Sequence, residues 1–318
     1  AEPDEEDLRL AGSSANRGNH PQQRSNTQGK WGVSAIQAQD GENEEAEPEV
    51  EQHLSGYTQG RGVSPVGGRR ECFQGGCMDE IRRLIASRSR ILVFTGAGIS
   101  TGSGIPDFRG PQGLWKRRQP VQFEDFLQHE SSRLEHWAYK LEGWRDFQAA
   151  RPNAAHRALV ELERSGRLLL LVTQNIDGLH HLAGHSEEKV VELHGTNRLV
   201  ECLQCGMRSE PAWAFEYFEK RKRCPMCLEC GGLVKTATIS FGQAMPADLL
   251  GRAFEAASQC DLVLSLGSTL SVQPAASVPS RAARHAPYVI INQGPTEHDS
   301  IARYRLNGNL TELLPALL

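Results

Sequence analysis

Hydrophobic residues recur along most of the chain in two patterns, one helical and one strand-like. Met78, Ile81, Leu84 and Ile85 lie at helical spacing, and the compact apolar run 91–94 follows them. A short, continuous apolar run is typical of a strand that is buried on both faces. The pattern therefore predicts a helix that leads into a buried strand.

The same alternation continues through the rest of the chain. A helix is expected to begin after Asn153 and to end near Gly166, before a strand at Leu168–Thr173. Further strands are predicted at 189–193, 262–266 and 288–291, and a further helix at 247–258. Near-continuous apolar strands separated by helices predict an α/β fold with a doubly wound, Rossmann-like parallel sheet that is covered on both faces.

Two segments interrupt this rhythm and predict a smaller second lobe. The segment at about 111–151 holds three of the five tryptophans and is expected to be helical, and the segment at about 201–232 is rich in cysteine. The Rossmann-like core is then formed by about 73–110, 152–200 and 233–318. Together these parts are expected to make one domain, 73–318.

The first part of the chain, 1–72, has a different composition. It is rich in Gln, Asn, Ser, Gly and Glu and carries an acidic run at 40–51. Such a segment buries too little apolar surface to offset the entropy of ordering. We expect a disordered acidic and polar tail, with a partner-binding arm as the alternative.

The overall composition is that of a soluble globular protein. Of the 318 residues 39% are hydrophobic, enough for one sizeable core. The longest apolar run, 168–172, is far shorter than the roughly 20 residues of a membrane-spanning helix, so no membrane segment is expected. A formal net charge of −4 provides no basic field for nucleic acid, and we expect no such partner.

The cysteine content favours a reducing compartment. Eight cysteines in a chain of this length are too few for a disulfide-stabilised scaffold, and most of them cluster at metal-ligand spacing. The acidic first residues lack the pattern of a secretory signal or a transit peptide. These features indicate the cytoplasm or, in a eukaryote, the mitochondrial matrix.

A glycine-rich segment follows the first predicted strand, with Gly96, Gly98, Gly102 and Gly104 close together. Glycine at the carboxyl end of a buried parallel strand lets backbone N–H groups approach a pyrophosphate. The usual dinucleotide fingerprint also needs glycine at its sixth position, which is Thr101 here. This departure argues against a dehydrogenase that transfers hydride, and spacing alone leaves a structural turn as the alternative.

Polar side chains follow two other predicted strands. Gln174, Asn175 and Asp177 come directly after Leu168–Thr173, and His194 follows the strand at 189–193. The carboxyl ends of parallel strands meet at the edge where ligands usually bind. A neutral imidazole there is suited to accept a proton at physiological pH. Taken alone, helix capping explains Asn175 and Asp177 equally well, and His194 is equally an ordinary surface residue.

Two Cys-x-x-Cys pairs predict a structural zinc site. Their spacing, with 21 residues between the pairs, suits a closed tetrahedral site of four thiolates. The first pair is Cys202 with Cys205. The second is either Cys227 with Cys230 or Cys224 with Cys227, because both have the required spacing. The other cysteines, Cys72, Cys77 and Cys260, are interpreted as unliganded.

The segment from Gly96 to Arg109 is similar, almost letter for letter, to the NAD-binding signature of the sirtuin family. Two further motifs match that family in the same order: Thr-Gln-Asn-Ile-Asp-Gly-Leu-His at 173–180, and His194 with glycine just before the first cysteine pair. The resemblance covers about 78–318, and the C-terminal part is closest to the mitochondrial-type and bacterial branch. It favours Cys227 with Cys230 as the second zinc pair, because sirtuins usually place two glycines after the last ligand.

The resemblance implies a set of residues that bind NAD. The glycine turn would meet the phosphates, a loop that includes Asp107 would close over the nicotinamide ribose, and Gln174 would meet the ribose. Asn175 and Asp177 would line the nicotinamide pocket, and Asn292 would meet the ribose on the adenine side. The implied set is Gly96, Ala97, Gly98, Ser100, Asp107, Phe108, Arg109, Gln174, Asn175, Asp177, Gly267, Ser268, Asn292 and Leu310.

The family chemistry implies that NAD is consumed and that no hydride is transferred. The acyl oxygen of a substrate lysine would attack the nicotinamide ribose and expel nicotinamide. His194 would then take a proton from a ribose hydroxyl, and hydrolysis would yield free lysine and O-acyl-ADP-ribose. Asn175 and Asp177 are the other two residues expected to take part in catalysis.

The same resemblance implies how a protein substrate binds. An acyl-lysine segment would insert as an added strand between 240–242 and 266–272, so that main-chain pairing gives affinity with little sequence preference. The basic run Lys116, Arg117 and Arg118 stands near the expected acyl tunnel. Such a run is more often a solvated face than a contact for acidic acyl groups.

The sequence therefore predicts an NAD-dependent protein deacylase with one structural zinc. The main alternative is a mono-ADP-ribosyltransferase, which would use the same NAD pocket and differ in its acceptor. A zinc-stabilised NAD-binding module without activity is a further alternative.

Overall fold

The computed structural model describes residues 70–71, 75–107 and 119–318. The predicted tail at 1–72 lies almost entirely outside these residues, and Phe108, Arg109 and the basic run at 116–118 lie outside them as well. All of the described residues belong to one compact unit, Gly67–Leu318.

The predicted parallel sheet is confirmed. It has seven strands in the order β1-β10-β9-β8-β2-β3-β4, and every neighbouring pair is parallel. Apart from the short outermost strand β1, this is the order of the Rossmann fold, in which the chain direction across the sheet reverses between β2 and β8. The strands are β1 (Arg70–Glu71), β2 (Ile91–Thr95), β3 (Leu168–Thr173), β4 (Val190–Glu192), β8 (Leu262–Leu266), β9 (Tyr288–Ile291) and β10 (Tyr304–Leu306).

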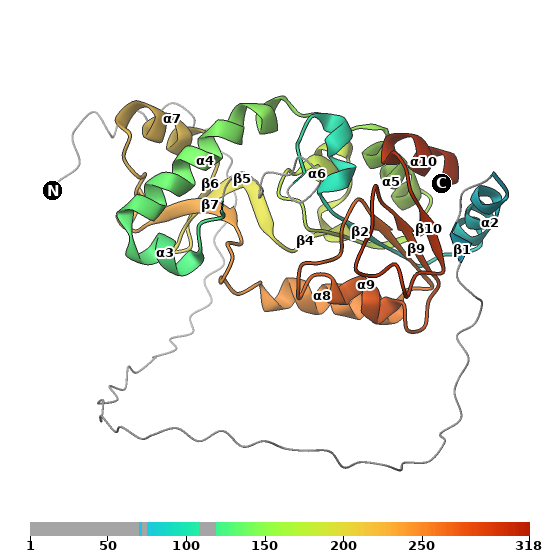
Figure 1. Cartoon of the computed structure of the whole chain (residues 1–318). Helices are drawn as coiled ribbons and strands as arrows, with labels where there is room; N and C mark the ends of the chain where they lie inside the picture. Colours follow the sequence, from blue (N-terminus) through green and yellow to red (C-terminus); the bar gives the residue numbers. More distant parts are fainter. Residues whose placement is uncertain (1–69, 72–74, 108–118) are drawn as a thin grey trace, which may run out of the picture. The chain divides into compact units, whose positions relative to one another are not determined.

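Helices cover both faces of this sheet, as Figure 1 shows. One face packs against α2 (Gly75–Ala86), α5 (Ala154–Arg164) and α10 (Leu310–Leu317), and the other packs against α8 (Ala247–Gln259) and α9 (Ser277–Ala282). Every residue of β2, β8 and β9 is buried. Burial on both faces explains why these strands are continuously apolar instead of alternating.

Local signals fix the ends of α5. The Asn153 side chain accepts hydrogen bonds from the backbone of Ala155 and His156, and the His156 ring bonds back to the backbone N–H of Asn153. This reciprocal capping box satisfies donors that a helix start leaves unpaired. Gly166, with a φ of 74°, takes the left-handed conformation just after the helix. The predicted limits of this helix are confirmed.

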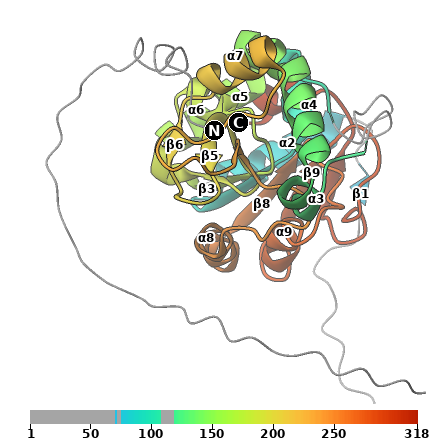
Figure 2. The ribbon, with the colours of Figure 1, turned by 90° about the vertical axis from the view of Figure 1, so that its left-hand side faces the viewer.

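The smaller lobe is built from α3 (Phe123–Gln128), α4 (Glu130–Ala149), α7 (Ala212–Arg221) and an antiparallel sheet, and Figure 2 views the structure from its side. The sheet has the order β6-β5-β7, with β5 (Gly195–Cys202), β6 (Arg208–Ser209) and β7 (Val234–Thr238). Trp137 of α4 is fully buried, and its ring packs against Phe215 and Phe218 of α7. β5 and β7 extend this lobe into residues that the sequence had assigned to the core, because these two strands pair with each other.

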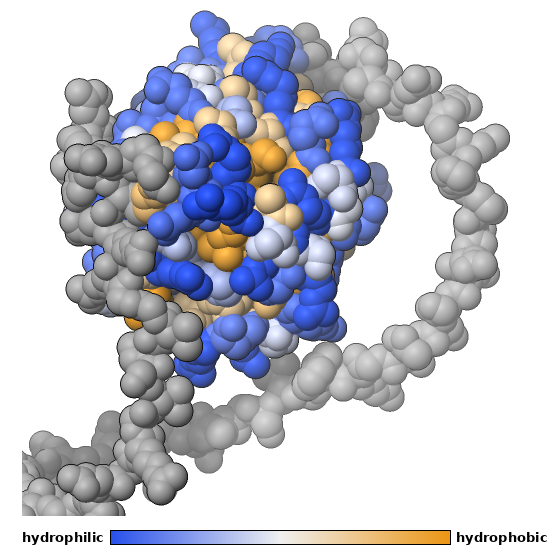
Figure 3. Space-filling view, turned by 90° about the vertical axis from the view of Figure 1, so that its right-hand side faces the viewer, coloured by the Kyte–Doolittle hydropathy of each residue, from blue (hydrophilic) through white to orange (hydrophobic). Residues whose placement is uncertain are grey.

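Two further observations concern the surface. In the part of the chain that the structure describes, every helix is too short or too polar to span a membrane. Figure 3 shows the face that carries α2, which is mainly hydrophilic with small scattered hydrophobic areas.

Candidate active site

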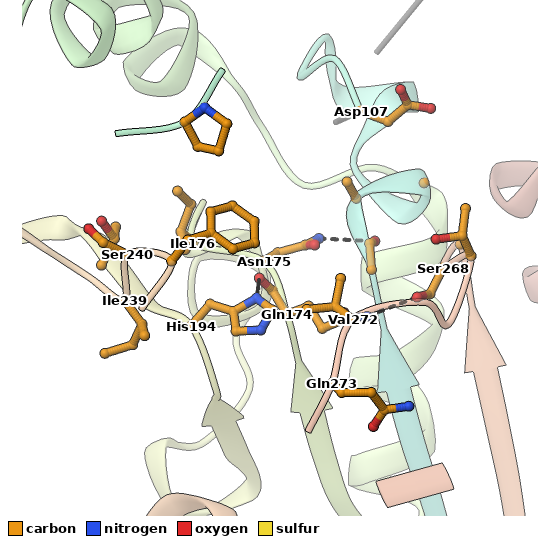
Figure 4. Close-up of a pocket in the computed structure, with 18 of the residues that line it drawn as sticks. Asp107, Gln174, Asn175, Ile176, His194, Ile239, Ser240, Ser268, Val272 and Gln273 are labelled. Carbon is orange, nitrogen blue, oxygen red and sulfur yellow. Dashed lines mark hydrogen bonds between the residues drawn. The ribbon is translucent and has the colours of Figure 1, made fainter. Parts of the chain in front are cut away.

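One cavity of about 390 Å³ lies where the strand order reverses, at the carboxyl ends of β2, β3 and β8. Ligands of open parallel sheets usually bind at this position. Figure 4 shows part of its wall. The cavity brings together most of the residues singled out from the sequence: Gly96, Ala97, Gly98, Asp107, Gln174, Asn175, His194, Gly267, Ser268, Asn292 and Leu310.

Two of the expected site residues lie behind this wall. Ser100 is fully buried and Asp177 is nine-tenths buried, and neither is among the described residues that line the cavity. Phe108 and Arg109 lie outside the described residues. Ser100 and Asp177 contact residues of the wall in this structure, and their contact with NAD stays a prediction.

The glycine turn packs directly against the turn after β8. The N–H of Gly96 donates to the carbonyl of Leu266 (3.0 Å), and the N–H of Gly98 donates to the carbonyl of Gly267 (2.8 Å). A Cβ atom on Gly98 would lie 2.7 Å from the Cα of Gly267, and one on Gly96 would lie 2.7 Å from its carbonyl oxygen. Glycine is required here by this close approach of two turns. Both N–H groups donate within the protein, and contact of the rest of the turn with a phosphate stays a prediction.

Asn175, Ser100 and Asp177 form a buried hydrogen-bond network. The Asn175 amide donates to the carbonyl of Gly96 (3.2 Å) and to Ser100 Oγ (3.1 Å), and Ser100 Oγ donates to Asp177 Oδ2 (2.6 Å). The other carboxylate oxygen accepts from the N–H of Leu179 (2.9 Å). Burial raises the pKa of Asp177, while the bonds from Ser100 and Leu179 oppose that rise. The carboxylate thus fixes Ser100, and Ser100 helps to orient Asn175.

Gln174 connects the ends of β3 and β8. Its side-chain amide donates to Ser268 Oγ (2.8 Å), and that oxygen also accepts from the N–H of Leu270 (3.1 Å). The bond fixes a polar wall across the point where the strand order reverses. Both side chains are visible in Figure 4.

His194 lies half-buried in the cavity wall, in the turn between β4 and β5. Its Nδ1 atom is 3.0 Å from the carbonyl oxygen of Gln174. A carbonyl oxygen only accepts, so Nδ1 carries the proton and the lone pair of the neutral ring lies on Nε2. The turn depends on Gly195, because its φ is 70° and a Cβ there would lie 2.1 Å from the carbonyl oxygen of Ala237. The arrangement provides a proton acceptor whose tautomer is set by the backbone.

The smaller lobe contributes a wall of the cavity that no sequence pattern predicted. This wall comes from the segment before α3, from α4 and from the end of β7, and it includes Val121, His136, Tyr139, Lys140 and Thr238. The residues at 119–140 carry no motif and lie far along the chain from the strand ends. Only the packing of the smaller lobe brings them to the cavity.

The four cysteines paired from the sequence meet in the smaller lobe. Their Sγ atoms all lie within 4.8 Å of one another, with Cys202 and Cys230 at 3.5 Å and Cys205 and Cys227 at 3.6 Å. Thiolates around a tetrahedral zinc at about 2.3 Å lie roughly 3.8 Å apart, so these four fit that ion. Cys224 is outside the cluster.

Comparison with known proteins agrees with this site. The model of the Sir2 family matches residues 96–274. A protein named NAD-dependent protein deacetylase from Rhodopseudomonas palustris is 45% identical over 238 residues, which are 74% of this chain and 94% of that protein.

Solved structures show the same similarity. A Sir2 structure with a deacetylated p53 peptide and 3'-O-acetyl ADP-ribose superposes with a TM-score of 0.71 at 34% identity, over 76% of this chain and 96% of that one. A complex of Sir2 with a p53 peptide and NAD⁺ superposes with a TM-score of 0.68 at 35% identity, over 74% and 95% of the two chains.

Proposed function

The chain belongs to the Sir2 family, and on this premise we propose that it is an NAD-dependent enzyme that removes acyl groups from lysine side chains of proteins. One observation carries the proposal. The glycine turn of a Rossmann-type sheet and a histidine with its tautomer set by the backbone line the same cavity.

The residues of the cavity fit NAD. The packed turns at Gly96 and Gly267 leave room beside the sheet, where Ala97, Gln174 and Asn292 line the wall. We propose that these residues hold the dinucleotide, with Leu310 at its edge. When bound, NAD supplies an activated ribose carbon and nicotinamide as the leaving group.

We assign the role of general base to His194. Because Nδ1 donates to the Gln174 carbonyl, Nε2 is the atom that accepts a proton from a hydroxyl group in the cavity. The bond also holds the ring in place, so that little reorientation is needed at the moment of transfer. A neutral imidazole that gains a proton here becomes a cation stabilised by the same carbonyl.

We assign Asn175 to direct contact with the nicotinamide side of NAD, and Asp177 to positioning. Asn175 lines the cavity, whereas Asp177 acts on it through Ser100. A carboxylate held behind the wall fixes the direction of the Ser100 hydroxyl. The Asn175 amide is then left with a defined orientation.

We propose that an acyl-lysine peptide binds as an added strand. The segment 240–242 after β7 and the segment 266–272 at the end of β8 both contribute residues to the cavity wall. The backbone of the peptide would pair with these two segments. Its acyl-lysine side chain would pass His194 and Ile239. These two residues are joined by a hydrogen bond from the Ile239 N–H to the His194 carbonyl (2.8 Å).

The four-cysteine cluster would hold one structural zinc. A closed set of four thiolates leaves no position for a reactive water, so the ion stabilises the smaller lobe only. Four thiolates at a zinc site suit a reducing compartment, for which we propose the cytoplasm or the mitochondrial matrix. We propose no nucleic-acid partner.

Incubation of the protein with NAD and acetyl-lysine peptides tests the function. The expected products are nicotinamide, deacetylated peptide and O-acetyl-ADP-ribose, which mass spectrometry identifies. Transfer of ADP-ribose to a protein acceptor, without loss of the acetyl group, would instead identify a mono-ADP-ribosyltransferase. Absence of nicotinamide release with every acyl peptide would leave only a binding module.

A further inference from the structure

The side chain of Asn153, the residue that caps α5, also reaches the glycine-rich turn after β2. Its Oδ1 atom accepts from the backbone N–H groups of Ala155 and His156. Its Nδ2 atom donates to the carbonyl of Ile99 (2.8 Å) and to Ser103 Oγ (2.9 Å). An amide group has two hydrogens to donate, so both donors are used. Asn153 is 9% exposed, and it therefore joins the start of α5 to the turn inside the protein.

The turn that Asn153 holds forms part of the cavity wall. It consists of two short 3₁₀ helices, η2 (Ala97–Ile99) and η3 (Thr101–Ser103). Three of its residues line the cavity: Ala97, Gly98 and Thr101. Ile99 is fully buried, and neither Ile99 nor Ser103 is among the described residues that line the cavity. Asn153 therefore acts on the turn from behind the wall.

The two halves of the turn are held in different ways. The start is held by backbone hydrogen bonds to the turn after β8. The second half begins at the peptide group between Ile99 and Ser100, whose carbonyl oxygen accepts from Asn153. The Ser100 hydroxyl belongs to the buried network that orients Asn175. The bond from Asn153 thus fixes the shape of the turn and the position from which Ser100 reaches Asn175.

The second half of the turn is packed closely between the starts of α5 and α10. A Cβ atom on Gly102 would lie 2.6 Å from Cγ2 of Thr311 on α10 and 3.4 Å from Nδ2 of Asn153. A buried carbonyl that lacks a hydrogen-bond partner is costly. Loss of the Asn153 donor should therefore favour other conformations of the turn, in which the Ile99 carbonyl finds another partner.

A binding wall that already has its bound conformation avoids the cost of ordering when the ligand binds. We propose that Asn153 is a positioning residue for NAD, which holds the glycine-rich turn in the conformation that binds the ADP-ribose half of the dinucleotide. Asn153 is not among the described residues that line the cavity, so it acts through the turn. This inference rests on the proposed NAD-dependent function and adds a residue to its nucleotide site.

Asn153→Asp and Asn153→Ser separate this role from helix capping. Aspartate and serine cap a helix about as well as asparagine, but neither keeps the amide that donates to the Ile99 carbonyl. Aspartate places a carboxylate oxygen beside that carbonyl, whereas serine removes the bond without adding charge. Serine also keeps the test decisive should the added charge unfold the aspartate variant.

Isothermal titration calorimetry with ADP-ribose measures the effect without any turnover. Both variants should bind ADP-ribose about 10-fold more weakly than the unmodified protein, the size expected when a buried acceptor loses its partner. Ser103→Ala is the matched control, because it removes the second acceptor of Asn153 and leaves the bond to Ile99. Its affinity for ADP-ribose should stay close to that of the unmodified protein.

Steady-state kinetics should separate the two substrates in the same way. In both Asn153 variants KM for NAD should rise by about 10-fold. KM for the acyl peptide at saturating NAD should change little, because the peptide is expected to bind at 240–242 and 266–272.

Equal affinity of Asn153→Asp, Asn153→Ser and the unmodified protein for ADP-ribose would show that Asn153 only caps α5, and it would overturn the inference. An equal rise of KM for NAD and for the peptide would also overturn it, because a general loss of structure affects both substrates. Absence of nicotinamide release from the unmodified protein would instead overturn the proposed function, and the titration with ADP-ribose would still decide the role of Asn153.

Discussion

The Nδ1 atom of His194 lies 3.0 Å from the backbone carbonyl oxygen of Gln174, at the end of the neighbouring strand. This bond to the main chain sets the histidine tautomer. The Gln174 side chain is in turn held by Ser268. The two strand ends and the turn after β8 thus form one rigid unit around the proposed base.

Replacement of His194 by alanine should abolish most deacylation and spare the earlier step. General base catalysis typically contributes about 10²- to 10⁴-fold, so we expect a loss of that size in kcat for formation of O-acyl-ADP-ribose. Exchange of labelled nicotinamide into NAD should be retained to a larger extent, because proton removal by His194 follows nicotinamide release in the proposed order. His129→Ala, on an exposed position before α4, is the matched control. Deacylation at the unmodified rate in His194→Ala would show that another group is the base.

The sequence predicted the large sheet well because its strands are buried on both faces. The strand limits at Leu168–Thr173 were correct, and the strands at 262–266 and 288–291 were found in full. A continuous apolar run is a direct consequence of double burial, and it needs no knowledge of the partner strands. The polar residues at the strand ends were found for the same reason.

The smaller lobe was predicted less completely. β7 contains Lys235, which is almost fully buried, and β5 begins with Gly195, Thr196, Asn197 and Arg198, so neither strand follows a simple apolar pattern. Their positions are fixed by pairing with each other and by the cysteine cluster. The contribution of Lys140 to the cavity depends on how α4 packs against this sheet, and no local pattern encodes that packing.

A methyl group on Gly98 should disrupt the contact between the two turns. The added Cβ would lie 2.7 Å from the Cα of Gly267, and backbone atoms cannot move aside easily. We expect Gly98→Ala to cost about 1–3 kcal/mol of unfolding free energy, as overpacking does, and to weaken NAD binding. Gly251→Ala on the exposed side of α8 meets open space and should stabilise the helix by up to about 1 kcal/mol. Thermal unfolding with and without NAD measures both effects, and equal behaviour of the two variants would contradict the close-packing argument.

Glu192, at the end of β4, should make stability depend on pH. Burial raises the pKa of this carboxyl to about 7, while Arg198 at 3.3 Å opposes the rise. The folded protein therefore binds a proton that the unfolded chain has already released, and the stabilising contribution of the protonated form is lost as the pH rises from the ordinary carboxyl range to about 7. Glu192→Gln should remove this loss. As the pH rises from about 4.5 to 7, the free energy of unfolding of Glu192→Gln should therefore increase relative to that of the unmodified protein, by at most roughly 3 kcal/mol.

Urea denaturation at several pH values measures this difference for Glu192. Glu188→Gln, at an exposed position shortly before β4, is the matched control and should follow the unmodified protein. A difference between Glu192→Gln and the unmodified protein that stays constant over this pH range would show that Glu192 ionises as it does in the unfolded chain.

The cysteines of the smaller lobe allow a sharp test of the metal site, because Cys224 lies only three residues before Cys227 and outside the cluster. Cys227→Ser should lose the bound zinc, since three thiolates and a hydroxyl hold this ion much less tightly than four thiolates. Binding of a structural metal is coupled to folding, so Cys227→Ser should also unfold at a lower temperature. Each kcal/mol lost lowers Tm by about 2–4 °C in a domain of this size. Cys224→Ser should keep both its zinc and its Tm. Elemental analysis of the purified variants, together with thermal unfolding before and after chelation, measures these effects. Cys227 belongs to both possible second pairs, so Cys230→Ser is the variant that separates them, and it should lose its zinc as Cys227→Ser does. Loss of zinc from Cys224→Ser with retention in Cys230→Ser would show that the other cysteine pair binds the metal.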